Sequence, residues 1–276
     1  MATVTMRNHD YTVAWVCALP LEMAAAKAML DEIHSDLPTS SNDQNTYVLG
    51  RIRAHNVAIA CLPSGIYGTI SAATVANQML STFRSIRFGL MVGIGGGVPS
   101  EGVDIRLGDV VVSKPTGDFG GVVQYDFGKM VGQGVFERTG RLNRPPQILL
   151  TAMARLQADQ MMETSRIPEH LSEMIAAFPR MQAEFTYHGQ EQDRLFDAAS
   201  DHYGLENTCD ACEMSRLVIR PARDRDDPVI HYGLIASGNQ VIKHGGTRDR
   251  LGQELGILCF EMERSEERRV GKECLE

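Results

Sequence analysis

Apolar runs that predict strands alternate with amphipathic stretches that predict helices along most of this chain. Strands are predicted over residues 11–19, 46–52, 57–62, 88–92, 107–113, 229–235 and 257–260. Helices are predicted over residues 20–30, after residue 68, and over 146–162, 168–178 and 247–255, where Gly256 ends the last one. The alternation of buried strands with helices is typical of an α/β sandwich.

Three segments interrupt this pattern. Residues 1–10 are polar, and we expect them to form a flexible N-terminus. Residues 117–134 are rich in glycine and long for a simple connection, which predicts a loop that covers a site. Residues 179–228 are polar and charged, and we expect an insertion that lies on the core rather than a separate domain.

A cluster of glycines follows the apolar run at residues 88–92. It contains Gly93, Gly95, Gly96 and Gly97. Because glycine has no Cβ, the backbone can approach a ligand closely, and open α/β sheets bind small molecules where their strands end. A tight turn between two core elements explains the same residues, so the cluster alone leaves both interpretations open.

Glu22 follows an earlier strand end in the same way. It comes after the run at residues 11–19 and lies in the first turn of the helix that begins at Pro20. A carboxylate in this position lies at the edge of the sheet where ligands bind. It also complements the helix dipole, and this purely structural role stays open.

Charge and composition narrow the classes of function. The chain has 276 residues, enough for one large domain or two small ones, with 35 acidic against 27 basic residues and a net charge of −8. This sign disfavours nucleic acid and anionic membranes as partners. No apolar run has the length of a membrane helix, and no cleavage signal follows residues 11–21. We therefore expect a cytoplasmic protein.

The cysteines agree with a reducing compartment, because they suggest no disulfide framework. They are Cys17, Cys61, Cys209, Cys212, Cys259 and Cys274. Cys209 and Cys212 form a C-x-x-C motif, but a zinc site needs two further ligands at matching spacing. We therefore expect no metal, and a zinc or redox role for this motif is the less favoured alternative.

Several strand ends carry a combination of motifs. These are Ser64-Gly65-Ile66, Leu107-Gly108-Asp109, Gly233-Leu-Ile-Ala-Ser-Gly238 and Phe260-Glu-Met-Glu263. Together with Glu22 and the glycine cluster, they resemble the nucleoside phosphorylase and nucleosidase superfamily, which cleaves the N-glycosidic bond of nucleosides. The resemblance covers residues 11–263 and is strongest to the fungal branch found in immune-receptor-like proteins.

The resemblance implies a three-layer α-β-α sandwich around a mixed twisted sheet, a homo-oligomer, no cofactor, and a site at the carboxyl ends of the strands. It implies that Glu263 binds the ribose hydroxyls, and that Met262, next to Glu261, packs against the sugar. The other residues that it places around the base and sugar are Ser64, Gly65, Gly93, Ile94, Gly95, Gly96, Ser237, Gly238, Asn239 and Phe260.

The expected chemistry suits carboxylates. Breaking the bond between ribose C1′ and a purine nitrogen builds positive charge on the sugar, which carboxylates stabilise, and a carboxylate can activate the attacking water. Glu22 lies where nucleosidases of this superfamily have that glutamate, and the arginines that bind phosphate in hexameric phosphorylases are missing here. We predict hydrolysis of purine nucleosides or of nucleotides such as AMP or ATP, with phosphorolysis by inorganic phosphate as the alternative.

The end of the chain departs from the superfamily pattern. After Glu263 the sequence is highly charged and has no apolar face, so we expect residues 264–276 to be a non-native tail. The aspartate with which the superfamily protonates the purine would then be missing. A domain that senses nucleosides or only oligomerises, without turnover, is therefore a third hypothesis. A nicotinamide dehydrogenase fits poorly, because the glycine cluster lacks the G-x-G-x-x-G spacing.

Overall fold

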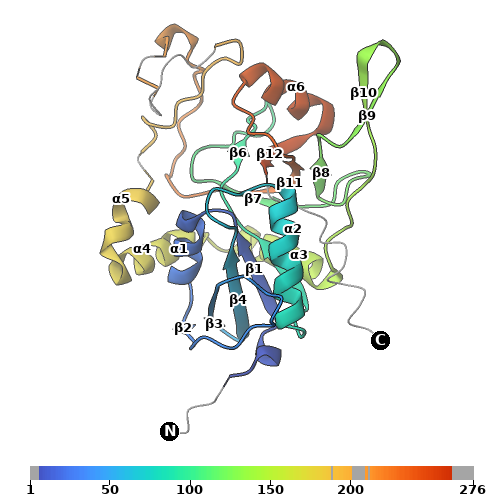
Figure 1. Ribbon diagram of the computed structural model, residues 1–276. Helices are drawn as coiled ribbons and strands as arrows, with labels where there is room; N and C mark the ends of the chain where they lie inside the picture. Colours follow the sequence, from blue (N-terminus) through green and yellow to red (C-terminus); the bar gives the residue numbers. More distant parts are fainter. Residues whose placement is uncertain (1–5, 188, 201–208, 211, 263–276) are drawn as a thin grey trace.

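Two five-stranded sheets, one above the other in Figure 1, form the frame of the protein. They are seen in a computed structural model that describes residues 6–187, 189–200, 209–210 and 212–262, with only the backbone of Gln133. The mixed α/β class predicted from the sequence is confirmed. Among the described residues no helix is both long and apolar enough to cross a membrane.

The first sheet is built from the N-terminal third of the chain. Its strands lie in the order β2 (Glu32–Ile33), β3 (Tyr47–Ile52), β4 (His55–Cys61), β1 (Val13–Cys17) and β5 (Phe88–Met91). Strand β1 runs parallel to β4 and β5, whereas β2 and β3 are antiparallel to their neighbours. The carboxyl ends of β1, β4 and β5 therefore lie at one edge of this sheet.

Helices α1 (Pro20–Ala28) and α2 (Thr69–Thr82) cover opposite faces of the first sheet. Successive side chains of a strand point to opposite faces, and in β1 Val13 and Cys17 pack in one cluster with Ala26 of α1. Ala14 and Val16 pack on the other face with residues of α2. This part of the chain is thus the expected sandwich of helix, sheet and helix.

The second sheet comes from the rest of the chain. Its strands lie in the order β6 (Gly96–Gly97), β12 (Ile257–Glu261), β11 (Ile230–Ser237) and β7 (Val110–Ser113), and β8 (Val122–Gln124) also pairs with β11. Helix α6 (Gly245–Leu255) buries Leu251 and Leu255 against this sheet. It ends at Gly256, whose φ of 66° is left-handed, as the sequence predicted.

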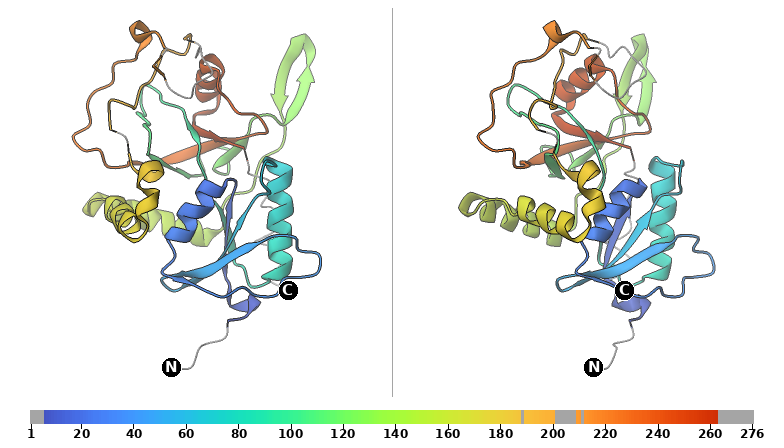
Figure 2. Two further views of the ribbon diagram at one scale, coloured as in Figure 1. Left: turned by 60° about the vertical axis from the view of Figure 1, so that its left-hand side comes forward. Right: turned by 90° about the vertical axis from the view of Figure 1, so that its left-hand side faces the viewer.

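The remaining elements lie outside the two sheets. Strands β9 (Gly128–Val131) and β10 (Val135–Arg138) form a hairpin that projects from the molecule in Figures 1 and 2. Helices α3 (Gln147–Met162), α4 (Ile167–Ala177) and α5 (Gln182–Phe185) follow, and short 3₁₀ turns lie at Asn8–Asp10, Gly132–Gly134, Pro179–Met181 and Met214–Arg216.

The structure differs from the sequence prediction in several places. Strands β2, β6 and β10 and helix α5 were not predicted. The segment at residues 117–134 was expected to be a loop, but it contains β8 and β9. The strand expected to begin at Leu107 begins at Val110, because Gly108 has a φ of 84° and Asp109 closes a turn by donating its N–H to the carbonyl of Arg106.

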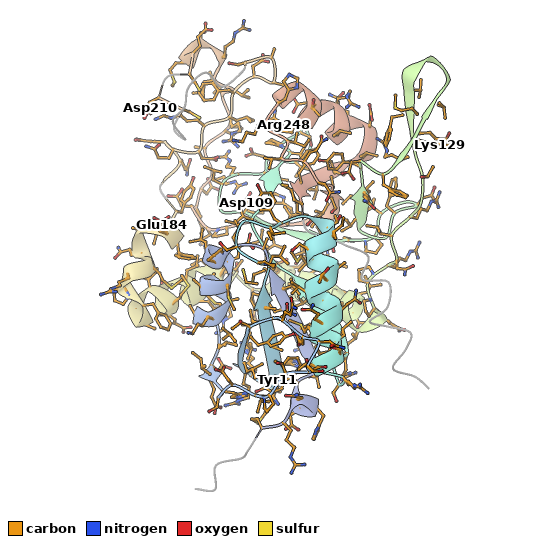
Figure 3. All side chains as sticks on the ribbon, viewed as in Figure 1. Tyr11, Asp109, Lys129, Glu184, Asp210 and Arg248 are labelled. Carbon is orange, nitrogen blue, oxygen red and sulfur yellow. The ribbon has the colours of Figure 1, made fainter. Side chains whose placement is uncertain are left out.

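Asp109 joins the insertion at residues 179–228 to the second sheet. Its side chain is 1% exposed and lies near the centre of the molecule in Figure 3. Both of its oxygens accept hydrogen bonds from Arg223, at 2.7 Å each. Nε2 of His231 donates to Oδ2 at 2.9 Å, and the N–H groups of Val229 and Arg106 complete the set.

These donors keep Asp109 ionised. Burial alone would raise the pKa of its carboxyl, but the hydrogen bonds from Arg223 and His231 lower the pKa well below its usual range. The hydrogen bonds that Arg223 donates to Asp109 raise the pKa of Arg223 in turn. A second residue of the insertion, Arg220, reaches Asp104 of the core at 3.4 Å. Charged pairs therefore hold the insertion on the core.

Replacing Asp109 with alanine is expected to lower the free energy of unfolding by about 3 kcal/mol, because Arg223 would lose its buried partner. Since the folded pKa of Asp109 is lowered, its contribution is complete above about pH 4 and is lost as the pH falls below that value. The difference between wild type and Asp109→Ala should therefore shrink in acid. Urea unfolding followed by the fluorescence of Trp15, the single tryptophan, measures it.

Asp118→Ala is the matched control, because the Asp118 side chain is 78% exposed and pairs with Arg141 at 3.5 Å on the surface. Its effect should stay below about 1 kcal/mol. Equal effects of the two substitutions would contradict the anchoring role of Asp109.

Candidate functional site

The ends of β1, β5 and β12 come together where the two sheets approach each other. Glu22 follows β1, and its carboxylate contacts the segment that follows β5. In that segment, Gly95 lies against Phe260 and Cys259 of β12. The structure therefore brings together three of the strand ends at which the sequence predicted a site.

Backbone donors hold the carboxylate of Glu22. Oε2 accepts the N–H groups of Ala18 at 2.7 Å and Leu19 at 3.0 Å. Oε1 accepts the N–H of Ile94 at 2.8 Å, which joins the start of α1 to the glycine cluster. The carboxylate is fixed by main-chain groups from two strand ends, so its position does not depend on other side chains.

The glycine cluster provides room for the protein's own atoms. A Cβ on Gly93 would lie 2.7 Å from Oε1 of Glu22, and one on Gly95 would lie 3.0 Å from the carbonyl of Phe260. Gly96 has open space around its Cβ position and pairs with Phe260 through β6. Gly93 is thus required for close packing on Glu22 and Gly95 for close packing on β12, in addition to any contact with a ligand.

Two thiols lie close to Glu22. Cys17 and Cys61 are paired across β1 and β4 at the ends of these strands. Burial, followed by the charge of Glu22, raises the pKa of Cys17 to about 12, and the same two causes raise the pKa of Cys61. Both thiols are therefore protonated at physiological pH, and they add no charge beside Glu22.

The turn after β4 contains Ser64 and Gly65. Both residues are exposed, and Gly65 has a φ of 79°. The turn is closed by the N–H of Ile66, which donates to the carbonyl of Pro63 at 2.9 Å. Because β4 lies next to β1, this turn lies at the same edge of the sheet as Glu22.

The segment Ser237-Gly238-Asn239 follows β11. Ser237 is fully buried, and a Cβ on Gly238 would lie 2.5 Å from the ring of Tyr125. Asn239 is bound on both sides. Its N–H and Nδ2 donate to Oδ2 of Asp126 at 2.7 and 3.3 Å, and its Oδ1 accepts from Thr69.

Sequence reasoning assigned no role to Asp126 or Thr69. Asp126 follows β8, and a polar residue after a strand was the signal used elsewhere, but β8 itself had been assigned to a loop. Thr69 begins α2 after Gly68, where glycine offers no side chain that would mark a helix cap.

Strand β12 carries the remaining predicted residues. Phe260 is buried and packs edge-to-face on Tyr125, with ring centroids 5.6 Å apart. The carbonyl of Glu261 accepts the N–H of Gly238 at 3.3 Å, which ties β12 to the turn after β11. Met262 is partly exposed at the end of the described chain. Glu263 lies outside the described residues, as does the segment 264–276.

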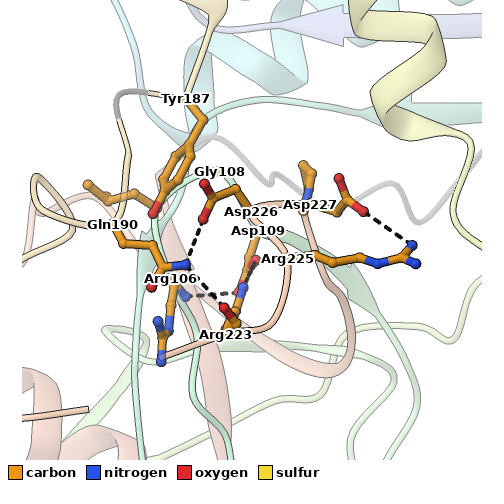
Figure 4. A pocket seen from close by; sticks show the side chains of 11 residues that line it. Arg106, Gly108, Asp109, Tyr187, Gln190, Arg223, Arg225, Asp226 and Asp227 are labelled. Carbon is orange, nitrogen blue, oxygen red and sulfur yellow. Dashed lines mark hydrogen bonds and ion pairs between the residues drawn. The ribbon is translucent and has the colours of Figure 1, made fainter. Parts of the chain in front are cut away.

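Two hollows lie near the insertion rather than at Glu22. A cavity of about 20 Å³, which fits a single water molecule, has Asp109 and Arg223 in its wall (Figure 4). A broad open hollow of about 570 Å³ is lined by residues 222–225 and 227–229. No predicted site residue lines either one. Within the described ranges, no group of three His, Cys, Asp or Glu side chains is placed to hold a metal.

A sequence model of the phosphorylase superfamily matches residues 12–274, nearly the whole chain. The chain belongs to the phosphorylase superfamily. This confirms the resemblance that the strand-end motifs indicated. The match begins one residue before β1 and includes every predicted site residue from Glu22 to Glu263.

Two proteins of similar sequence match nearly the whole chain. A nucleotide-binding leucine-rich repeat (NLR)-like protein of Hyaloscypha variabilis is 45% identical over 260 residues, which are 94% of this chain and 25% of that protein. The chain thus spans about a quarter of that relative's length. A 5′-methylthioadenosine/S-adenosylhomocysteine nucleosidase of Mycobacterium bovis is 26% identical over 252 residues, covering 91% of this chain and 76% of the relative.

A solved structure shows the same fold. It is the Neisseria meningitidis 5′-methylthioadenosine/S-adenosylhomocysteine nucleosidase in complex with methylthio-immucillin-A. It is 14% identical to this chain with a TM-score of 0.52, and the match covers 92% of this chain and 76% of that one.

Gly93→Ala tests the packing around Glu22. The added Cβ would displace the Glu22 carboxylate or the backbone, so the substitution is expected to cost about 1–3 kcal/mol of folding free energy. Gly96→Ala is the control, because its Cβ would meet no atom within 4 Å. Urea unfolding of both variants measures the difference. A destabilisation by Gly96→Ala equal to that by Gly93→Ala would show that Glu22 does not set the glycine requirement.

Proposed function

We propose that this chain cleaves the N-glycosidic bond of purine nucleosides or nucleotides by hydrolysis, and that Glu22 activates the water. The observation that carries the proposal is the carboxylate of Glu22, which three backbone N–H groups fix where strand ends meet. Membership of the phosphorylase superfamily and the 26% identity to a nucleosidase support the reaction class.

Glu22 has an acceptor position left for water. Each carboxylate oxygen can accept two hydrogen bonds. Oε2 accepts two from Ala18 and Leu19, whereas Oε1 accepts one from Ile94. As the C1′–N bond breaks, the purine leaves with the bonding electron pair and takes up a proton from solvent. The oxygen of a water bound to Oε1 bonds to C1′, and Glu22 takes the proton that this water releases.

The surroundings of Glu22 suit a nucleoside. Large apolar side chains are exposed on the turns after the strand ends, at Leu19, Ile66, Tyr67, Ile94 and Val241. Such side chains offer a flat base an apolar surface to pack on. We assign Ser64, Gly65 and the backbone of residues 93–96 to substrate contact, and the buried Ser237 and Phe260 to the support of the pocket wall.

The charge at the site favours water over phosphate as the nucleophile. The turns at residues 18–23 and 62–68 contain no arginine or lysine, and Glu22 would repel a phosphate ion. A phosphorylase needs cations beside its phosphate, for which arginine is best suited.

Glu22→Gln is expected to lower kcat for base release by about 100- to 10,000-fold, because an amide cannot take the proton of water. The amide oxygen can accept the N–H groups of Ala18 and Leu19, whereas the amide NH₂ would face the N–H of Ile94 and lose that hydrogen bond, so a lower melting temperature is expected beside the loss of kcat. Chromatographic assay of free base from adenosine, AMP and ATP, each with and without phosphate, measures the rate. Glu32→Gln, on the exposed strand β2, is the control and should keep wild-type activity.

The outcomes separate the three hypotheses. Base release without phosphate supports the hydrolase. Strict dependence on phosphate would identify a phosphorylase, and nucleoside binding without base release would identify a sensing domain. Wild-type turnover by Glu22→Gln would remove Glu22 from the mechanism.

We propose as well that the protein forms homo-oligomers and that the β9–β10 hairpin contributes to the contact. Met130 and Phe136 are directly opposite each other in the hairpin register, so their side chains share one face. Met130 is 67% exposed and Phe136 is 38% exposed. The other face is mixed, because Lys129 pairs there with Glu137 at 3.4 Å beside Val135, which is 57% exposed.

Met130→Lys is expected to shift the protein towards the monomer, since a charge would replace an apolar group in the contact. Light scattering after size-exclusion chromatography measures the mass. Lys129→Met adds an apolar side chain to the opposite face and serves as the control. A wild-type protein that is monomeric at micromolar concentration would overturn this proposal.

A further inference from the structure

A chain of hydrogen bonds joins the two sheets beside the proposed site. Oδ2 of Asp126, after β8, accepts the N–H of Asn239 at 2.7 Å and its Nδ2 at 3.3 Å. Oδ1 of Asn239, after β11, accepts the N–H of Thr69 at 3.2 Å and its hydroxyl at 3.0 Å. Thr69 is the first residue of α2, which packs on the first sheet.

Asn239 supplies an acceptor for the first residue of α2. The N-cap residue, Gly68, has no side chain, and its φ of 101° is left-handed. A Cβ at Gly68 would lie 3.1 Å from Oδ1 of Asn239, so glycine allows the close approach. The first N–H of α2, that of Thr69, therefore finds its acceptor on a residue 170 positions later.

The side chain of Asn239 is largely occupied by these contacts. Its Oδ1 accepts two hydrogen bonds and its Nδ2 donates one, so three of its four hydrogen-bonding positions are taken by Thr69 and Asp126. Asp126 in turn directs Oδ2 at Asn239, while its Oδ1 is buried and has no hydrogen-bond partner among the described residues. Asn239 is thus the principal described hydrogen-bonding partner of a partly buried carboxylate.

We propose that Asn239 is a positioning residue, anchored by Asp126, that sets the distance between the turn at residues 63–69 and the turn at 238–241. These turns carry the exposed side chains of Tyr67 and Val241, which the proposed function assigns to the surface that the base packs on. The inference rests on the proposed function for what the two turns bind. It replaces the direct substrate contact that the sequence suggested for Asn239.

The geometry requires an amide at position 239. An aspartate would place a carboxylate oxygen about where Nδ2 now lies, 3.3 Å from Oδ2 of Asp126. Two carboxylates this close cannot both ionise without a large cost, and the pair would take up a proton. Once protonated, the aspartate can donate to Asp126 and still accept from Thr69. We call the chain of hydrogen bonds from Thr69 through residue 239 to Asp126 the relay. In the Asn239→Asp variant the relay should therefore depend on pH.

The test is a double-mutant cycle between Asn239→Asp and Asp126→Asn. Asn239→Asp should lower the melting temperature at pH 8 and recover towards wild type at pH 5. Asp126→Asn should lower the melting temperature of the wild type, because a neutral acceptor is weaker. In the Asn239→Asp background it should raise the melting temperature, because it removes the repulsion. This reversal of sign is the signature of the relay.

A second measurement tests positioning. At pH 8, kcat/KM of Asn239→Asp for adenosine should fall on the order of 10- to 100-fold, and it should recover at pH 5 relative to wild type at the same pH. The affinity for adenosine, measured by calorimetry in the Glu22→Gln background where base release is slow, should follow the same course. Asn77→Asp adds the same charge at an exposed position of α2 and should change neither quantity. Thr69→Ser keeps both donors and should behave as wild type, whereas Thr69→Val loses one.

The outcomes distinguish this inference from the proposed function. Melting temperatures need no turnover, so additive effects of the two substitutions would overturn the relay whatever the activity. A sign reversal with unchanged kcat/KM and adenosine affinity in Asn239→Asp at pH 8 would overturn the positioning role. If the wild type releases no base, the proposed function fails, and the relay is still decided by melting temperature and adenosine affinity.

Discussion

The site depends on one carboxylate and the main-chain groups that bind it. Glu22 accepts hydrogen bonds from the N–H groups of Ala18, Leu19 and Ile94, and it thereby joins the first turn of α1 to the segment that leaves β5. Charge-assisted bonds to backbone donors are stronger than neutral ones, and backbone donors at strand ends move little. Whatever chemistry Glu22 performs, the sheet holds it in place.

The glycines beside this carboxylate have two different neighbours. Gly93 leaves the space that the Glu22 side chain fills, and Gly95 lets the chain pass close to the carbonyl of Phe260 as it crosses from the first sheet to the second. The two sheets therefore approach each other at glycines, which have no side chain to keep the backbones apart. Polar contacts farther out, at Asn239 and Asp109, then fix the position of the turns and of the insertion.

Much of this arrangement could be predicted from the sequence. The strands of the first sheet and the helices beside them are long enough for the spacing of their apolar residues to distinguish strand from helix. Strand β8 has only three residues, Val122–Gln124, among glycines, so neither it nor the role of Asp126 after it could be seen. The partner of Asp109, Arg223, lies 114 residues away in a polar segment without any period. Such pairs leave no local signal, because they arise only when the chain has folded.

The contact between Asn239 and Thr69, at the start of α2, also has a consequence for the order of folding. All five strands of the first sheet lie within residues 13–91, and Ile94, which completes the Glu22 contacts, follows directly. A ribosome releases this part first, and domains fold largely in that direction. The hydrogen bonds from Thr69 at the start of α2, however, form only once Asn239 has been made, 170 residues later. During synthesis, the carboxylate of Glu22 can therefore be held in place before the turns at residues 63–69 and 238–241 are joined.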